Sequence, residues 1–272
     1  MSPGKRGCRH RSCPRRNRRT RLRSPPLGRA PGLVIAKAVL LAAGRGNRLG
    51  ELTVNTPKPL LTVAGRPIIV HILDGLRRAG IEDITIVTGH FAEMLETELG
   101  NGEASGLHLR YVRQGQPDGT ARALQLARDW LGDDQFFFGW GDILVRPENY
   151  RNVVRAARLA DAAIAVNHVD DPWAGAAVYV DEANVVQRIV EKPPKGTSTT
   201  HWNNAGFGVL GPAIWPEVDR LQPSPRGEYE LPQAIAALVE SGARVVAVPI
   251  EGDWFDIGTP EDLERARAAW RK

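Results

Sequence analysis

The strongest constraint on the fold is a repeating order of apolar segments, in which runs that suit a buried strand alternate with runs that suit a helix. Residues 34–42 form a continuous apolar run followed by glycine. Apolar residues then recur at helical spacing over residues 68–76, Gly80 ends that helix, and residues 84–87 form a second apolar run. This order predicts a right-handed βαβ unit in a mostly parallel α/β sheet.

The pattern continues with a third strand over residues 107–112, a helix over 120–131 and a fourth strand over 135–140. The fourth strand ends in Gly141 and Asp142. Because parallel strands point the same way, the loops that follow them collect at one edge of the sheet, where open α/β sheets bind ligands. The sequence therefore predicts a Rossmann-like fold with helices on both faces of the sheet and a ligand site at this edge.

After Asp142 the alternation changes, and a hairpin is expected around residues 181–184. The expected elements are helices over 150–159, 231–239 and 260–270, and strands over 162–167, 176–180, 185–190, 204–211 and 245–249. No internal repeat and no linker divides this part of the sequence. We therefore expect one domain over residues 34–272, with an inserted, partly antiparallel half.

Residues 1–33 differ from the rest in composition. They hold 11 of the 36 Lys and Arg and none of the 31 Asp and Glu, so the remainder carries a net charge of about −6. This segment is rich in Arg, Ser, Pro and Gly, which predicts disorder. We interpret it as a basic tail or as the product of a wrongly chosen upstream start codon, with a transit peptide or a nucleic-acid-binding arm as alternatives.

Both cysteines, Cys8 and Cys13, also lie in this segment, so the body has no thiol for a disulfide or for catalysis. With His10 they give only three potential zinc ligands where a structural site needs four. No run of about 18 apolar residues suggests a membrane span. The sequence therefore predicts a cytoplasmic protein without a membrane or nucleic-acid partner.

The loop LAAGRGNRLGELTVNTPKPL, residues 41–60, combines glycines with basic residues directly after a buried strand. Glycines let backbone amides approach an anion, and Arg48 and Lys58 can neutralise phosphate charge. An ordinary glycine-rich turn is the alternative. A dinucleotide fingerprint is excluded because Gly50 is one place late and no helical pattern follows, and a Walker A loop would need Gly-Lys-Ser/Thr.

This loop resembles the signature of the sugar-nucleotide pyrophosphorylases, which runs roughly G-G-x-G-T-R-L-x-P-L-T-x-x-x-P-K-P. The family includes glucose-1-phosphate thymidylyltransferases, uridylyltransferases and mannose-1-phosphate guanylyltransferases. The charged residues match, whereas Asn47 and Glu51 replace the usual Thr and Pro. The resemblance implies that Arg48 holds the departing pyrophosphate and Lys58 the reacting phosphates. The nucleotide-binding residues that it implies in this loop are Leu41, Ala42, Ala43, Gly44 and Gly46.

Further matches follow in the family's order over nearly all of residues 36–265. Taken singly, each has an ordinary explanation, such as a helix cap for Asp142 or a capped helix start for Glu228. The resemblance implies nucleotide contacts for Gln114, Gly119 and Thr120, with Gln114 and Gly119 at the nucleobase edge. It implies sugar contacts for Glu191, Asn204, Gly206 and Glu228, a sugar-phosphate contact for Lys192, and a metal site of Asp142 and Asp256.

The implied reaction joins a nucleoside monophosphate from an NTP, with dTTP or UTP favoured, to a sugar 1-phosphate and releases pyrophosphate, with Mg²⁺ as cofactor. The phosphate oxygen that attacks is already ionised near neutral pH, so no protein nucleophile is required. A mannose-1-phosphate guanylyltransferase, a cytidylyltransferase acting on another phosphate, and a non-catalytic sugar-nucleotide-binding regulator remain alternatives. The resemblance also allows a homo-oligomer.

Overall fold

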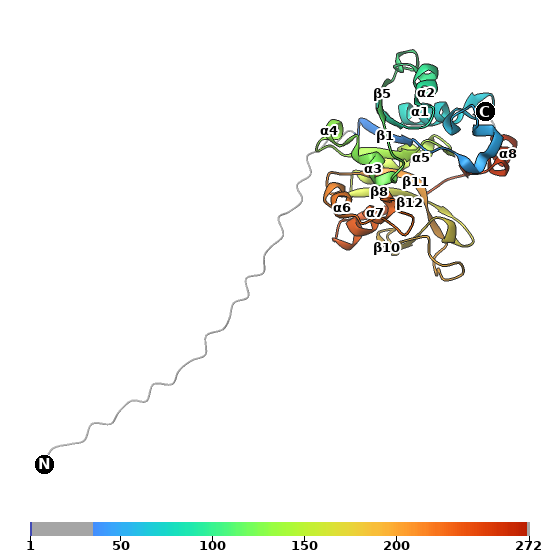
Figure 1. Cartoon of the computed structure of the whole chain (residues 1–272). Helices are drawn as coiled ribbons and strands as arrows, with labels where there is room; N and C mark the ends of the chain where they lie inside the picture. The colour runs from blue at the N-terminus through green and yellow to red at the C-terminus, as the bar shows by residue number, and fades with distance from the viewer. Residues whose placement is uncertain (2–34, 271–272) are drawn as a thin grey trace. The chain divides into compact units, whose positions relative to one another are not determined.

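The computed structural model describes residue 1 and residues 35–270, so the predictions for residues 1–33 lie outside the described part. Residues 35–270 form a three-layer α/β fold around a nine-stranded mixed sheet, whose main path runs β10-β9-β11-β6-β1-β4-β5 (Figure 1). β8 pairs with both β11 and β12 off this path. In the described residues, no helix is both long and apolar enough to cross a membrane.

One half of the sheet is parallel. It consists of β1 (Lys37–Ala42), β4 (Asp83–Thr88), β5 (His108–Arg113) and β6 (Phe136–Trp140), with β1 between β4 and β6. The chain crosses from β1 to β4 on one side, and later returns from β5 to β6 on the other side of β1. The carboxyl ends of β1 and β6 therefore mark a topological switch point, where a crevice forms.

The other half is mostly antiparallel and is organised by β11 (Trp202–Leu210), which pairs antiparallel with β6, β8 (Ala162–His168) and β9 (Ala176–Val180). β9 and β10 (Val186–Glu191) form the expected hairpin, and β12 (Val245–Pro249) runs parallel to β8. The register of β11 shifts between Asn204 and Gly208. Such bulges redirect side chains and are common beside functional sites. The predicted fold class, with its partly antiparallel insertion, is confirmed.

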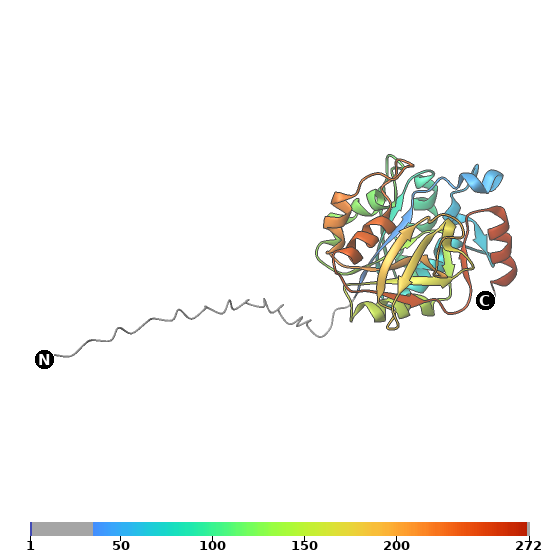
Figure 2. The same cartoon turned by 90° about the horizontal axis from the view of Figure 1, so that it is seen from below.

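Helices cover both faces of the sheet, as Figure 2 also shows. The helices α1 (Ile68–Arg78), α2 (Ala92–Leu99), α5 (Glu148–Ala157) and α8 (Pro260–Ala269) pack on one face. The helices α3 (Thr120–Gln125), α4 (Arg128–Leu131), α6 (Ile214–Arg220) and α7 (Leu231–Glu240) pack on the other. Side chains of β1 alternate between the two cores, with Leu40 in the first and Leu41 in the second. This explains the continuous apolar run of that strand.

Several short elements were not predicted. The helix expected over residues 120–131 is two helices, because the chain turns after Gln125 and leaves Leu126 44% exposed. The prediction of no helical segment after the glycines was wrong, since a 3₁₀ helix occupies residues 47–53 with a non-helical Gly50 inside it. The other unpredicted elements are α2, α6, η2 (Lys58–Leu60), β2 (Thr62–Val63), β3 (Arg66–Pro67), η3 (Glu103–Ser105), β7 (Ile143–Val145), η4 (Pro172–Ala174) and β13 (Trp254–Asp256).

Candidate functional site

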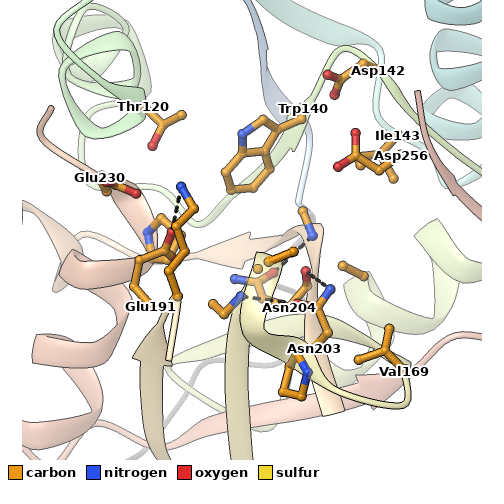
Figure 3. Close-up of a pocket in the computed structure, with 18 of the residues that line it drawn as sticks. Thr120, Trp140, Asp142, Ile143, Val169, Glu191, Asn203, Asn204, Glu230 and Asp256 are labelled. Carbon is orange, nitrogen blue, oxygen red and sulfur yellow. Dashed lines mark hydrogen bonds and ion pairs between the residues drawn. The ribbon is translucent and has the colours of Figure 1, made fainter. Parts of the chain in front are cut away.

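Two cavities open at the carboxyl edge of the parallel strands. The larger has a volume of about 440 Å³, and Figure 3 shows part of its lining. Most of the predicted site residues line it: Arg48, Thr120, Asp142, Glu191, Lys192, Asn204, Gly206, Glu228 and Asp256. The smaller, of about 230 Å³, is lined by Ala43, Arg45, Gly89, His90, Gln114, Gly115 and Pro117. The remaining predicted residues line neither cavity: Leu41, Ala42, Gly44, Gly46, Lys58 and Gly119.

The glycine-containing loop folds back on itself after β1. Gly46 has a φ of 69°, and its carbonyl oxygen accepts a hydrogen bond of 3.0 Å from the Thr53 hydroxyl. A Cβ atom at Gly46 would lie 3.0 Å from the Thr53 methyl group and 3.4 Å from Cβ of Lys58. Gly44, in contrast, has no heavy atom within 4 Å of such a Cβ position. The loop is therefore tightly packed where it supports Lys58 and open where an anion could approach the backbone.

Lys58 joins the two predicted metal ligands. Its side chain is 11% exposed, and its Nζ donates a hydrogen bond to Oδ2 of Asp142 and lies 4.0 Å from Oδ1 of Asp256. Asp142 lies between β6 and β7, two residues after the end of β6, whereas Asp256 ends β13, where it pairs with Ile143 of β7. The Ile257 amide also donates to the Asp142 carbonyl at 3.2 Å. The small β7–β13 sheet thus brings together two carboxylates that are far apart in the sequence.

Burial and, to a smaller extent, the nearby Asp142 carboxylate raise the pKa of Asp256 to about 6, while Lys58 and Arg48 act in the opposite direction. Arg48 reaches this region from the glycine-containing loop. Its Nη2 would lie 3.1 Å from a Cβ atom added at Gly258, two residues after Asp256. Among the residues that the structure describes, no three His, Cys, Asp or Glu side chains form a group that could hold a metal ion. Two carboxylates nevertheless fit Mg²⁺, because this ion commonly binds one or two protein carboxylates and takes its other ligands from phosphates and water.

The loop before α3 connects the two cavities. Gln114 Nε2 donates to Oδ1 of Asp118 at 2.9 Å and to the Gly119 carbonyl at 3.1 Å. Both partners are acceptors, so the amide orientation is fixed and Oε1 stays free of this network. Next to it, the Thr120 hydroxyl accepts a 2.8 Å hydrogen bond from the amide of Leu231, the first residue of α7. The nucleotide roles predicted for Gln114, Gly119 and Thr120 remain predictions.

At the opposite end of the larger cavity, β10 ends in Glu191, and Lys192 follows with a φ of 45°. The Lys192 amide donates to the Gly175 carbonyl at 2.7 Å, which fixes this unusual backbone, and its Nζ lies 3.6 Å from Oε1 of Glu191. Burial raises the pKa of Glu191 to about 7, and a hydrogen bond with Glu230 contributes to the shift. Glu191 is therefore more readily protonated than an ordinary glutamate near neutral pH.

Arg226 and Glu230 line the cavity but were not among the predicted site residues. Nη2 of Arg226 lies 2.5 Å from Oε1 of Glu230 and 3.6 Å from Oε2 of Glu228. Burial would raise the pKa of Glu230, but hydrogen bonds with Arg226 and Glu191 outweigh it and lower that pKa. The sequence pattern R-G-E-Y-E, residues 226–230 before α7, is the feature that could have indicated these two residues. Only the fold shows that Glu230, with a side chain 9% exposed, lies deeper than Glu228, which is 44% exposed.

Asn204 and Gly206 lie in the irregular part of β11. The Gly206 amide donates to Oδ1 of Asn204 at 3.0 Å, while Nδ2 of Asn204 is buried and has no hydrogen-bond partner among the described residues. Gly206 has a φ of 86°, and an added Cβ would lie 3.1 Å from Cγ1 of Ile143. The neighbouring Asn203 is structural, since its Oδ1 accepts from the Ala176 amide at 3.1 Å.

Residues 37–272 match the family model described as nucleotidyl transferase. The chain is 36% identical over 236 residues to the UTP–glucose-1-phosphate uridylyltransferase AglF of Haloferax volcanii, an alignment that covers 85% of this chain and 94% of AglF. It is 34% identical over 231 residues to the glucose-1-phosphate thymidylyltransferase of Streptomyces antibioticus, covering 84% of this chain and 64% of that one.

A low-salt glycan biosynthesis nucleotidyltransferase of Haloferax volcanii is likewise covered over only 64% of its length, so the chain spans less than two thirds of two of these relatives. Among solved structures, a protein of Bacillus anthracis assigned as a glucose-1-phosphate thymidylyltransferase and crystallised with sucrose is similar, with a TM-score of 0.78 and 29% identity. The similarity covers 85% of this chain and 94% of that one.

Proposed function

Because the chain belongs to the nucleotidyl transferase family, we propose that it transfers a nucleoside monophosphate from an NTP to a sugar 1-phosphate, giving a nucleoside diphosphate sugar and pyrophosphate. The match to the family model confirms the family resemblance of the sequence. We propose dTTP or UTP as the preferred nucleotide, since the relatives named above include a thymidylyltransferase and a uridylyltransferase.

The observation that carries the proposal is the division of the larger cavity into two chemically different ends. One end holds Arg48, Asp142 and Asp256, and Lys58 lies directly behind the two carboxylates. The other end holds acceptors suited to sugar hydroxyl groups, among them Glu191, with Lys192 beside it. A sugar 1-phosphate has this same polarity, with an uncharged hydroxylated ring and one anionic end.

In the proposed reaction, an oxygen of the sugar phosphate forms a bond to the α-phosphorus of the NTP. The bond from the α-phosphorus to the β-phosphate oxygen breaks, and its electron pair leaves with pyrophosphate. No side chain has to act as a nucleophile. The site has to align two polyanions and offset their repulsion, which positioned cations do well where water is excluded. We assign Arg48 to the leaving pyrophosphate and Lys58 to the transferred phosphate. We also assign Lys192 to the sugar phosphate, which requires its side chain to leave Glu191 and extend along the cavity.

Asp142 and Asp256 would hold Mg²⁺, which when bound would neutralise phosphate charge and bridge the two substrates. Their joint contact with Lys58 supports this assignment, because the lysine holds both carboxylates at one point.

The test is a pyrophosphate-release screen of the full chain that crosses dTTP, UTP, GTP and CTP with glucose, N-acetylglucosamine, mannose and N-acetylmuramate 1-phosphates. We expect release with dTTP or UTP, dependent on Mg²⁺. Preference for GTP with mannose 1-phosphate would establish the guanylyltransferase alternative, and preference for CTP the cytidylyltransferase alternative. No release with any pair would overturn the proposal in favour of a non-catalytic regulator.

The variant Asp142→Asn tests the site itself. We expect it to lower turnover at least about 10³-fold, since it removes one of two carboxylates from a position where charge is stabilised. The matched control is Asp133→Asn, an exposed acid in the turn before β6 that lines neither cavity. Near-normal turnover of Asp142→Asn would rule out the proposed metal site.

A further inference from the structure

Trp140 is the last residue of β6 and directly precedes Gly141 and Asp142. It is half-buried, and it is one of two aromatic residues in the lining of the larger cavity. The other, Trp254, is fixed by its own hydrogen bond, in which Nε1 donates to the Ala205 carbonyl at 3.0 Å. For Trp140, the structure shows packing contacts of the indole ring with its neighbours.

Two neighbours pack against the indole. Phe138 contacts it edge to face, with ring centroids 5.8 Å apart. On another side, a Cβ at Gly206 would lie only 3.3 Å from Cε3 of Trp140, so the absence of a side chain at Gly206 leaves the space that the ring occupies. The backbone of Trp140 is paired with Leu41 of β1. A rigid aromatic ring at a cavity wall presents a flat apolar surface at little entropic cost.

The indole of Trp140 lies between the two ends of the larger cavity. In the view of Figure 3, Asp142 and Asp256 are on one side of the indole, and Glu191 and Glu230 are on the other. Asn204 lies across the cavity from it. A molecule with its phosphate near Asp142 and Asp256 and its hydroxyl groups near Glu191 must therefore pass over the indole of Trp140.

A pyranose ring matches such a surface. Its hydroxyl groups point outward around the rim, where carboxylates can accept their hydrogen bonds, while its two faces expose C–H groups. These C–H groups carry partial positive charge and pack well on the negative face of an aromatic ring. A nucleobase is the competing occupant, but the smaller cavity lined by Gln114 lies at the same sheet edge and Trp140 does not line it.

We propose that Trp140 is the platform on which the sugar ring of the sugar 1-phosphate rests, and that it sets the affinity for this substrate independently of the nucleotide. The inference rests on the proposed function for the identity of the ligand. It assigns to Trp140 a contact with the non-reacting part of the substrate. Removing the indole therefore weakens sugar binding and leaves the transfer step intact.

The first experiment compares Trp140→Leu and Trp140→Phe with the wild type, using the best pair of substrates from the screen. We expect Trp140→Leu to raise the KM for the sugar 1-phosphate about tenfold, because an aromatic contact is lost. The KM for the NTP and kcat should stay within about threefold. Trp140→Phe keeps a ring and should restore the sugar KM to within about threefold of the wild type. The control pair is Trp130→Leu and Trp130→Phe, since Trp130 is also half-buried but lines neither cavity.

The second experiment needs no turnover. Tryptophan fluorescence of the full chain is titrated with the sugar 1-phosphate alone, or with glucose 1-phosphate if no pair is turned over. The change seen in the wild type should be smaller in Trp140→Phe and unchanged in Trp130→Phe, and a Trp254→Phe variant measures the part that comes from the other tryptophan of the lining. Failure of the wild type to release pyrophosphate, together with this fluorescence result, would reject the proposed function and retain the inference.

An unchanged sugar KM in Trp140→Leu would overturn the inference, as would an increase confined to the KM for the NTP. A fluorescence change of full size in Trp140→Phe would do the same. Trp140→Phe decides the question even where Trp140→Leu fails to fold.

Discussion

Gly119 is the position where one added methyl group should disturb the site most. Its φ and ψ of 120° and 167° fall in a region that is essentially limited to glycine. An added Cβ would lie 2.3 Å from the carbonyl oxygen and 2.5 Å from the amide nitrogen of Tyr229. Those groups are already hydrogen-bonded, since the Tyr229 amide donates to the Asp118 backbone carbonyl at 2.8 Å and the Tyr229 carbonyl accepts from the Ala121 amide at 2.9 Å. The variant Gly119→Ala must therefore break or displace this junction.

The backbone strain costs about 1–3 kcal/mol. Overpacking against the Tyr229 backbone adds about 1–3 kcal/mol, because backbone atoms cannot rotate away as a flexible side chain could. We expect Gly119→Ala to lower the free energy of unfolding by about 2–6 kcal/mol, a large part of the roughly 5–15 kcal/mol that holds a domain together. The displaced segment also carries Arg226 and Glu228, so the KM for the sugar 1-phosphate should rise together with that for the NTP.

Urea unfolding followed by circular dichroism measures this difference. Gly115→Ala is the matched control, because Gly115 lies in the same loop, has no positive φ and has no heavy atom within 4 Å of its Cβ position. We expect that control to remain within about 1 kcal/mol of the wild type. Equal unfolding free energies for Gly119→Ala and Gly115→Ala would refute the reasoning.

Two further predictions concern charge and capping. Burial raises the pKa of Glu191 from 4.5 to about 7, so its contribution to stability is fully present below about pH 4.5 and is lost as the pH rises through 7. Urea unfolding between pH 4.5 and 8 should therefore show a smaller loss of stability in Glu191→Gln than in the wild type, and parallel curves would contradict the shift. Thr259 caps α8 through a reciprocal capping box with Asp262, so Thr259→Ala should cost about 1 kcal/mol in the same assay, with Thr259→Ser restoring most of it. An unaffected Thr259→Ala variant would show that the cap contributes nothing.

The parallel half of the sheet could be predicted because its signals are local. The apolar run of β1 is buried on both faces, and such a strand is recognisable without its neighbours. The glycines and basic residues after it are also a local pattern. The edge at which the candidate residues gather followed from strand direction alone. Helix ends were less certain, since residues 120–131 have the composition of one helix and only the exposed Leu126 shows where the core stops.

The pairing of side chains inside the site could not be predicted, because it depends on register between distant strands. Asp256 reaches Asp142 through the three-residue strands β7 and β13, which are too short to show a periodic pattern. Glu228 and Glu230 have the same residue type two positions apart, so the sequence does not distinguish the deeper one. The hydrogen bond from the Leu231 amide to Thr120 fixes the start of α7 and thereby places Glu230 beside Glu191.

The charges of the site suggest how its two ends are coupled. Lys58 and Lys192 each contact an acid, namely Asp142 and Glu191. A bound phosphate must draw such a cation away from its carboxylate, so the gain from each phosphate contact is reduced by the ion pair that it replaces. The released carboxylates are the groups that we assign to the metal ion and to the sugar hydroxyl groups. Binding of phosphate therefore favours binding of metal and sugar, and linkage requires the reverse effect to be equally large.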